Sequence, residues 1–201
     1  DWVVEEAFAE VPGWHPAVRR VIPVALRRWR RAPFAAWRSG EWARFRQALA
    51  EQPHELVIDA QGLLKSAFVA RLTGAACAGY DRRSVREPLA ACAYHRRFPV
   101  TRECHAIERT RQLFAQALDY TVPPGEPCYG IDRARLPQVS AEGGVLFLHG
   151  TSRADKCWPE ASWIALGEQV ARAGHAVLLP WGNEAERARA QRIAHVLPAA
   201  R

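Results

Sequence analysis

The residues best suited to chemistry lie close together in one turn, from His149 to Lys156. This turn contains Gly150, the adjacent hydroxyl side chains of Thr151 and Ser152, and the ammonium group of Lys156. Small hydroxyls and backbone N–H groups near a helix start, together with a cation, are the parts of an anion-binding site. The same turn would also suit an ordinary connection between a strand and a helix, in which a hydroxyl only caps the helix. Both interpretations stay open on this local pattern.

The elements around this turn predict an α/β fold. Residues 145–148 are apolar without alternation, which is typical of a parallel strand covered on both faces. A helix over residues 159–173, a strand over residues 175–179 and a helix over residues 184–196 are expected to follow. This order predicts an open α/β sheet, and such sheets bind ligands at the carboxyl ends of their strands. The turn lies at such an end.

A separate α/β unit is expected before it. The expected strands are residues 1–6, 18–23, 55–59 and 76–80, and the expected helices are residues 39–52 with Ser39 as the N-cap, a helix within residues 60–74, and residues 105–118. The rest of residues 75–103 is expected to be irregular. Prolines and glycines are concentrated in residues 120–144, which is typical of a domain boundary. The predicted domains are residues 1–135 and 145–201, joined by a linker over residues 136–144.

The overall charge points to a negatively charged partner. Lys and Arg number 28 against 21 Asp and Glu, which gives a formal net charge of +7. Nucleic acid, an anionic membrane surface and a phosphorylated substrate are all compatible with this charge. No run approaches the roughly 18 apolar residues of a membrane span, and no signal segment opens the chain, so a cytosolic location is expected.

The cysteines predict free thiols rather than a metal site or disulfides. There are five of them, an odd number, with no C-x-x-C pair and no zinc spacing. The sequence also contains no Met and opens on residues 1–4 (DWVV) as if within a strand. The chain is therefore expected to be part of a longer protein, with material missing at both ends.

Four stretches carry a family signature when they are taken together. They are residues 2–6 (WVVEE), 57–65 (VIDAQGLLK), 147–160 (FLHGTSRADKCWPE) and 179–186 (LPWGNEAE). In this order, from end to end of the chain, they resemble the family-9 heptosyltransferases of lipopolysaccharide core synthesis. The resemblance implies a GT-B architecture, in which two Rossmann-like domains face each other across a cleft. Both domains would be incomplete in this chain.

The resemblance also implies an activity. A protein of this kind would transfer L-glycero-D-manno-heptose from ADP-heptose to the Kdo of Kdo2-lipid A, with inversion, without a metal ion and without a cofactor besides the donor substrate. A family-9 transferase acting on a later core sugar is the alternative. The implied partners are ADP-heptose, Kdo2-lipid A and an anionic membrane surface, with no nucleic acid. The implied location is the cytoplasmic face of the inner membrane, and the sequence indicates no oligomeric state.

Residue by residue, the resemblance assigns the donor site to the second predicted domain. Thr151 and Ser152 would hydrogen-bond the diphosphate, Lys156 would neutralise it, and Glu186 would bind the nucleoside portion. Ser152 departs from the usual threonine of the family but keeps the hydroxyl, and Cys157 stands where many relatives have histidine. Fixed donors and a cation would stabilise the charge that develops on a diphosphate leaving group. Without the resemblance, Glu186 would be interpreted as an exposed acid in the first turn of a helix.

The catalytic base is expected outside this chain. An inverting transfer needs a carboxylate that takes the proton of the acceptor hydroxyl. The family places its aspartate in a loop that would lie before Asp1, so the chain alone is expected to be inactive. Asp59 is the last residue of a predicted strand, but its surroundings do not match that loop.

A basic stretch over residues 19–46 supplies most of the predicted acceptor site. It contains nine arginines and one acid, Glu41, interleaved with three tryptophans. Arginine suits carboxylates and phosphates because its planar fork makes paired hydrogen bonds. The predicted acceptor residues are Arg27, Arg28, Arg30, Arg31, Lys65 and Arg86. A solvated basic face, a membrane-contact surface and a nucleic-acid groove are the alternatives, and the last would make the protein a basic α/β nucleic-acid-binding module.

Overall fold

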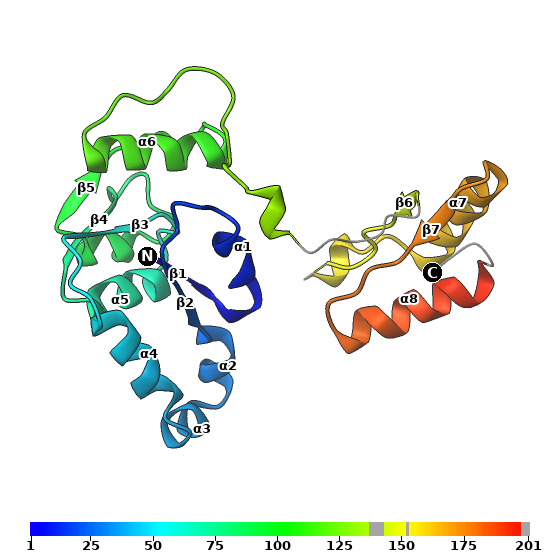
Figure 1. Cartoon of the computed structure of the whole chain (residues 1–201), viewed down its shortest axis with the longest axis horizontal. Coiled ribbons are helices and arrows are strands. Elements are labelled where there is room, and N and C mark those ends of the chain that lie inside the picture. The colour runs from blue at the N-terminus through cyan, green and yellow to red at the C-terminus, as the bar shows by residue number, and fades with distance from the viewer. Residues whose placement is uncertain (137–142, 152, 198–201) are drawn as a thin grey trace. The chain divides into compact units, whose positions relative to one another are not determined.

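A computed structural model describes residues 1–136, 143–151 and 153–197 of the chain. Its contacts divide the chain into two compact units, Asp1–Leu136 and Pro137–Arg201, and each unit is described by itself. Both units combine parallel strands with helices (Figure 1). Parallel strands need crossover connections, and helices supply most of them here.

Parallel strands form two sheets in the described part of the first unit. The strands are β1 (Trp2–Glu5), β2 (Val21–Val24), β3 (Leu56–Asp59), β4 (Ala76–Tyr80) and β5 (Arg96–Phe98). β1 pairs with β2, with Trp2 opposite Val21. The second sheet has the order β3-β4-β5, with Asp59 opposite Gly79. β4 is therefore the central strand of the larger sheet.

Helices cover both faces of the larger sheet. The helices of the first unit are α1 (Glu10–Gly13), α2 (Leu26–Arg31), α3 (Pro33–Arg38), α4 (Glu41–Ala50), α5 (Leu64–Leu72) and α6 (Ala106–Leu118), with short 3-10 turns at Glu6–Phe8, Pro88–Ala93 and Arg133–Arg135. α5 and α6 lie on opposite sides of the sheet (Figure 1). Ala67 of α5 and Leu113 of α6 share a core with Cys77 and Tyr80 of β4. Residues 77–80 are consequently all buried.

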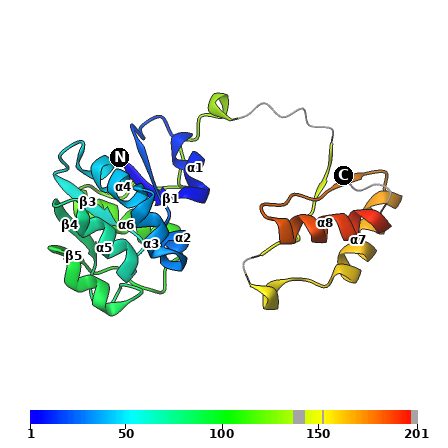
Figure 2. The ribbon, with the colours of Figure 1, turned by 90° about the horizontal axis from the view of Figure 1, so that it is seen from below.

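The described part of the second unit contains two strands and two long helices. β6 (Gly144–Leu146) pairs in parallel with β7 (Ala176–Leu178). α7 (Glu160–Arg172) and α8 (Glu184–Val196) lie side by side in both views (Figures 1 and 2). A short 3-10 turn covers Ala154–Lys156. The core residues are Phe147, Val177, Leu179, Ala190, Ile193 and Leu197.

The first unit differs from the sequence prediction in several places. Ser39 is not an N-cap: it ends α3, where its hydroxyl donates to the Ala36 carbonyl at 3.2 Å, and Gly40 with φ of +73° separates α3 from α4. Residues 26–31 and 33–38, for which no element was predicted, form α2 and α3. Residues 75–103 contain β5 and a 3-10 turn besides β4, because β5 is too short and polar to show alternation and forms by pairing with β4.

The strand before the predicted anion turn is less buried than expected. Val145, Leu146 and Leu148 are 37%, 55% and 71% exposed, whereas Phe147 is 2% exposed. In the described residues of this unit, β6 pairs with β7 alone, and α7 and α8 cover the face occupied by Phe147. Among the described residues, one face of this strand is therefore covered, and cover on both faces stays a prediction.

Candidate functional site

The two loops that follow β6 and β7 meet at one carboxylate. Glu186 lies in the first turn of α8, where its backbone N–H donates to the side chain of the N-cap Asn183 at 3.0 Å. Its Oε2 accepts a hydrogen bond from the Gly182 N–H at 2.8 Å. A Cβ atom on Gly150 would lie only 2.8 Å from Glu186 Cδ and 2.9 Å from Oε1. Glu186 therefore packs directly on the turn after β6, and this contact requires glycine at position 150.

Thr151 and Lys156 lie exposed in the same turn. The Lys156 backbone N–H donates to the Arg153 carbonyl at 3.1 Å. The neighbouring acid, Asp155, is paired with Arg153, whose Nε lies 2.9 Å from Asp155 Oδ1. None of the ion pairs among the described residues involves Lys156, so its ammonium group is available to an anion. Ser152, the other predicted diphosphate ligand, lies outside the described residues.

A buried histidine lies at the base of this turn. His149 is 2% exposed, and neither ring nitrogen has a hydrogen-bond partner in the part of the chain that the structure describes. Phe147 is equally buried, and the His149 backbone N–H donates to the Phe147 carbonyl at 2.9 Å, which makes a tight turn between the two residues. Sequence reasoning placed His149 in the turn but missed its burial. That burial depends on packing within the folded unit, which the local sequence does not show.

The other end of the turn is tied to α8. Glu160, the first residue of α7, accepts hydrogen bonds from Arg192 at 3.1 Å (Nε) and 2.6 Å (Nη2). The Arg192 hydrogen bonds lower the pKa of Glu160 and raise that of Arg192. Arg189 donates a further hydrogen bond to the Trp158 carbonyl. The segment from β6 to α7 is thus held by α8 at both of its ends.

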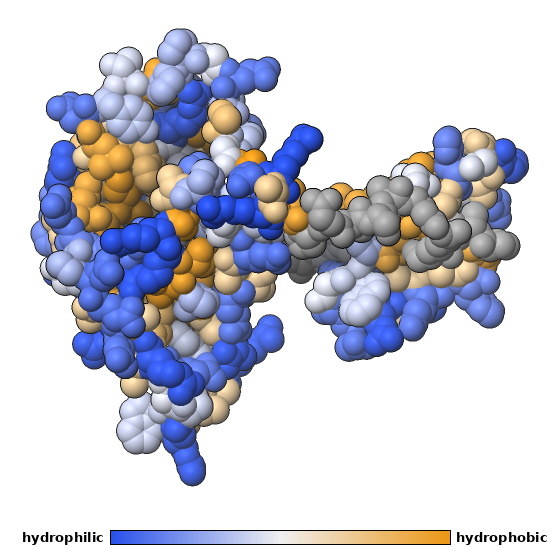
Figure 3. Space-filling model, in the orientation of Figure 1, coloured by the Kyte–Doolittle hydropathy of each residue, from blue (hydrophilic) through white to orange (hydrophobic). Residues whose placement is uncertain are grey.

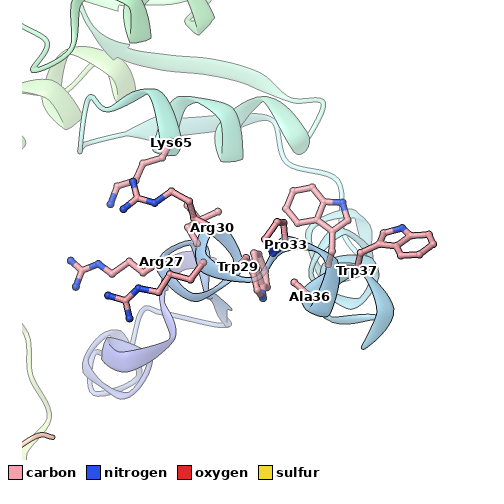
Figure 4. A pocket seen from close by; sticks show the side chains of 10 residues that line it. Arg27, Trp29, Arg30, Pro33, Ala36, Trp37 and Lys65 are labelled. Carbon is pink, nitrogen blue, oxygen red and sulfur yellow. The ribbon is translucent and has the colours of Figure 1, made fainter.

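Four of the predicted acceptor residues line one pocket of the first unit. The pocket has a volume of about 610 Å³, and its cations are Arg27, Arg30 and Arg31 of α2 and Lys65 of α5. The charged ends of Arg27, Arg30 and Lys65 lie on the same side, whereas Trp37 lies at the other end (Figure 4). No acidic side chain belongs to the pocket lining among the described residues. Such a concentration of one sign of charge attracts anions.

Aromatic side chains form the apolar part of this pocket. The rings of Trp29 and Trp42 meet edge-on with centroids 5.7 Å apart, and Trp42 stacks on Phe68 at 6.1 Å. Trp29 Nε1 donates to Glu41 Oε2 at 2.7 Å, which fixes the ring. Hydrophilic and apolar residues alternate on the surface of this region, around α2, α3 and α4 (Figure 3). The pocket therefore offers charged donors beside apolar surface.

The other two predicted acceptor residues lie outside the pocket lining. Arg28 is paired with Glu6 at 2.9 Å and with Glu41 at 2.8 Å, and these carboxylates raise the pKa of Arg28. Arg28 thereby connects α2 to α4 and to the turn after β1. Arg86 is exposed and lies beside Gly62, in the loop before α5. A Cβ atom added to Gly62 would lie 3.3 Å from the Arg86 backbone N. A role for either arginine in acceptor binding stays a prediction.

Asp59 organises the loop between β3 and α5. It is 5% exposed, and its Oδ1 accepts hydrogen bonds from the backbone N–H groups of Gln61 (2.9 Å) and Gly62 (3.2 Å). Its Oδ2 accepts from the hydroxyls of Ser66 (2.8 Å) and Tyr94 (2.7 Å). Burial, together with the Asp59 carboxylate, raises the pKa of the Tyr94 hydroxyl, so Tyr94 remains a donor. Both Asp59 oxygens are engaged, and this residue has a structural role.

The described residues contain neither a cluster of metal ligands nor a membrane-spanning helix. Within residues 1–136, 143–151 and 153–197, no group of three or more His, Cys, Asp and Glu side chains could hold a metal ion. None of the helices that the structure describes is long and apolar enough to cross a membrane.

The fold and the donor-site motifs agree with one protein family. The model of glycosyltransferase family 9 (heptosyltransferase) matches residues 42–200, and the chain belongs to this family. Lipopolysaccharide heptosyltransferase 1 of Pseudomonas aeruginosa is 56% identical over 196 residues, which are 96% of this chain and 55% of that protein. The protein of the same name from Escherichia coli K12 is 47% identical over 197 residues, 96% of this chain and 62% of its own length. The chain thus spans 55% and 62% of these two relatives.

Solved structures give the same result. The structure titled E. coli heptosyltransferase WaaC with ADP matches with a TM-score of 0.88 and 45% identity, over 100% of this chain and 63% of that chain. WaaC with ADP-2-deoxy-2-fluoro heptose matches with a TM-score of 0.87. E. coli ADP-heptose lps heptosyltransferase II matches at 0.63 with 16% identity, which shows the fold alone. The predicted α/β fold of the GT-B heptosyltransferases is confirmed.

Proposed function

We propose that the full-length protein transfers L-glycero-D-manno-heptose from ADP-heptose to the Kdo of Kdo2-lipid A, a step of lipopolysaccharide core synthesis. Relatives named lipopolysaccharide heptosyltransferase 1 support this, as do similar structures solved with ADP and with an ADP-heptose analogue. The observation that carries the proposal is the contact between Glu186 and Gly150. This contact brings together residues 147–160 and residues 179–186, the two motifs assigned to the donor.

The donor binds at the carboxyl ends of β6 and β7. Lys156 neutralises the diphosphate, and Thr151 and Ser152 donate hydrogen bonds to its oxygens. Glu186 accepts hydrogen bonds from the ribose hydroxyls of the nucleoside. The bond to the leaving diphosphate breaks with development of negative charge, and a fixed cation with fixed donors lowers the free energy of that state. Transfer proceeds with inversion and without a metal ion.

The acceptor binds in the pocket of the first unit. Kdo carboxylates and lipid A phosphates are anions, and Arg27, Arg30 and Arg31 supply planar forks that bind such groups with paired hydrogen bonds. Lys65 adds a compact charge from α5. The aromatic part of the pocket packs against the apolar surface of the glycolipid. In this proposal residues 1–135 form the acceptor-side domain, residues 136–144 the linker, and residues 145–201 part of the nucleotide-sugar domain.

The acceptor is embedded in a membrane, so the pocket must reach its surface. Phe34 and Trp37 of α3 are 81% and 73% exposed. Arg30, Arg31 and Arg38 are exposed close to them in the sequence. Aromatic side chains favour the membrane–water interface, and clustered arginines are attracted to anionic lipids. The full-length protein therefore works peripherally at the cytoplasmic face of the inner membrane, with α3 toward the lipid.

The proposal is tested with the full-length protein, ADP-heptose and Kdo2-lipid A in detergent, with a chelator present. We expect mass spectrometry to show one added heptose on the acceptor. If only an acceptor that already carries heptose is extended, the protein acts on a later core sugar. No transfer to either acceptor would contradict the proposed function.

A further inference from the structure

Three side chains of α8 reach the segment between β6 and α7. They are Glu186, Arg189 and Arg192, which lie three residues apart in sequence. Residues at this spacing are neighbours along a helix surface. Glu186 packs on Gly150 at the start of the segment, whereas the two arginines bind its end.

The contacts at the end of the segment are directional. Glu160 receives two hydrogen bonds from the Arg192 guanidinium, the paired geometry that gives the strongest orientation. The Arg189 guanidinium donates to the Trp158 carbonyl, two residues before Glu160. Trp158 also meets Trp163 of α7 edge-on, with ring centroids 5.2 Å apart. The backbone between residues 158 and 160 is thus fixed to both helices.

The middle of the segment has far fewer restraints. Thr151, Arg153 and Lys156 are exposed, and the ion pair that Arg153 makes with Asp155 among the described residues is local to the turn. His149 is buried beneath it, yet neither ring nitrogen has a partner among the described residues. The side-chain hydrogen bonds that connect the described part of this segment to the rest of the unit therefore come from α8.

We propose that Arg192 and Glu160 are a positioning pair for donor binding, an inference that rests on the proposed function. Neither residue touches the donor. Their paired hydrogen bonds hold the end of the turn, so that Thr151 and Lys156 are already arranged when the diphosphate arrives. A prearranged site binds more tightly because less ordering accompanies binding. An ion pair as exposed as this one contributes little to folding, so its loss acts mainly on the donor.

The test compares variants of the full-length protein in which one charged residue is replaced by glutamine. For Arg192→Gln and Glu160→Gln we expect ADP to bind about three- to tenfold more weakly by titration calorimetry. The KM for ADP-heptose should rise together with the dissociation constant for ADP. The KM for Kdo2-lipid A and the melting temperature should stay near the wild-type values. Arg172→Gln is the matched control, because Arg172 lies in the same unit and its one side-chain hydrogen bond among the described residues goes to the Glu168 carbonyl on its own helix.

A double variant distinguishes loss of the positioning of Lys156 from a general loosening of the turn. If the pair acts through Lys156, then adding Arg192→Gln to Lys156→Ala should weaken ADP binding by less than about twofold, because coupled residues are not additive. Full additivity would overturn the proposal, as would an Arg192→Gln protein that binds ADP like the Arg172→Gln control. Wild-type protein that binds no ADP would instead overturn the proposed function itself.

Discussion

The two units hold their candidate sites by different means. In the first unit helices cover both faces of the sheet, every residue from 77 to 80 is buried, and the loop after β3 is fixed by the buried carboxylate of Asp59. In the second unit β6 is exposed at Gly144, Val145 and Leu146, and its loop is held by side chains of α8. Among the described residues, a buried carboxylate thus positions the loop in the first unit, and side chains of a neighbouring helix position it in the second.

Both units contain ion pairs that neutralise acidic side chains near the candidate site. Near each site, one arginine pairs with the local acids: Arg28 with Glu6 and Glu41 in the first unit, and Arg153 with Asp155 in the second. These pairs neutralise the carboxylates that would otherwise repel an anion. The remaining cations keep their charge for a ligand.

The largest expected effect is on the core of the first unit. A Cβ on Gly79 would lie 2.4 Å from the Tyr94 ring, so Gly79→Ala forces β4 away from a buried side chain. Overpacking of this kind should destabilise the protein by about 2–3 kcal/mol in urea unfolding. Gly13→Ala is the control, because nothing lies within 4 Å of its Cβ position. Equal stability of the two variants would show that the first unit is not tightly packed there.

The corresponding glycine of the second unit should affect binding instead of stability. In Gly150→Ala the new methyl group would displace the Glu186 carboxylate, which lies 2.8 Å from it at Cδ. We expect ADP affinity to fall about tenfold, the loss of one hydrogen-bonding group to the ligand, with little change in melting temperature. Gly143→Ala, in open space, should bind ADP normally. A Gly150→Ala protein that binds ADP like this control would remove Glu186 from the donor site.

A smaller effect is expected when the Asp59 network loses one donor. Tyr94→Phe removes the 2.7 Å hydrogen bond to Asp59 but keeps the ring against Gly79. We expect a loss of about 1 kcal/mol in unfolding free energy and no change in ADP affinity. Tyr129→Phe, at an exposed tyrosine, should leave both quantities unchanged. A change in ADP affinity in Tyr94→Phe would show that the two units are coupled.

The smallest expected change is a shift in two carboxyl pKa values, measured by NMR titration. The Arg192 hydrogen bonds hold the pKa of Glu160 below its ordinary value, and the Trp29 hydrogen bond is the main cause of the low pKa of Glu41. A lowered carboxyl pKa stabilises the fold above about pH 4.3, and this stabilisation is lost as the pH falls through the folded-state value. Arg192→Gln should raise the pKa of Glu160 alone, and Trp29→Phe that of Glu41 alone. A shift of the other carboxyl in either variant would contradict these assignments.

Sequence patterns predicted the elements with strong local signals. α8 spans Glu184–Val196 as expected, because Asn183 caps it and its apolar positions recur at helical spacing. β5 could not be predicted, since three residues, Arg96–Phe98, form a strand only by pairing with β4. The exposure of β6 depends on which elements pack beside it, which the local sequence does not state.

The site was predictable as a set of residues but not as an arrangement. The motifs indicated Lys156 and Glu186 separately, yet their connection depends on the approach of Glu186 to Gly150 across 36 residues of sequence. Likewise the basic stretch indicated Arg28, whereas its pairing with Glu6 and Glu41 becomes visible only once β1, α2 and α4 are packed together. Long-range contacts of this kind leave no local pattern.

The two lysines of the chain provide the most direct test, because the donor is assigned to the second unit and the acceptor to the first. ADP binding to full-length Lys156→Ala and Lys65→Ala proteins should be measured by titration calorimetry. We expect Lys156→Ala to weaken ADP binding about ten- to a hundredfold, the cost of losing a charged partner of the diphosphate, and Lys65→Ala to bind ADP like the wild type. Wild-type affinity in Lys156→Ala, or an equal loss in both variants, would contradict this assignment.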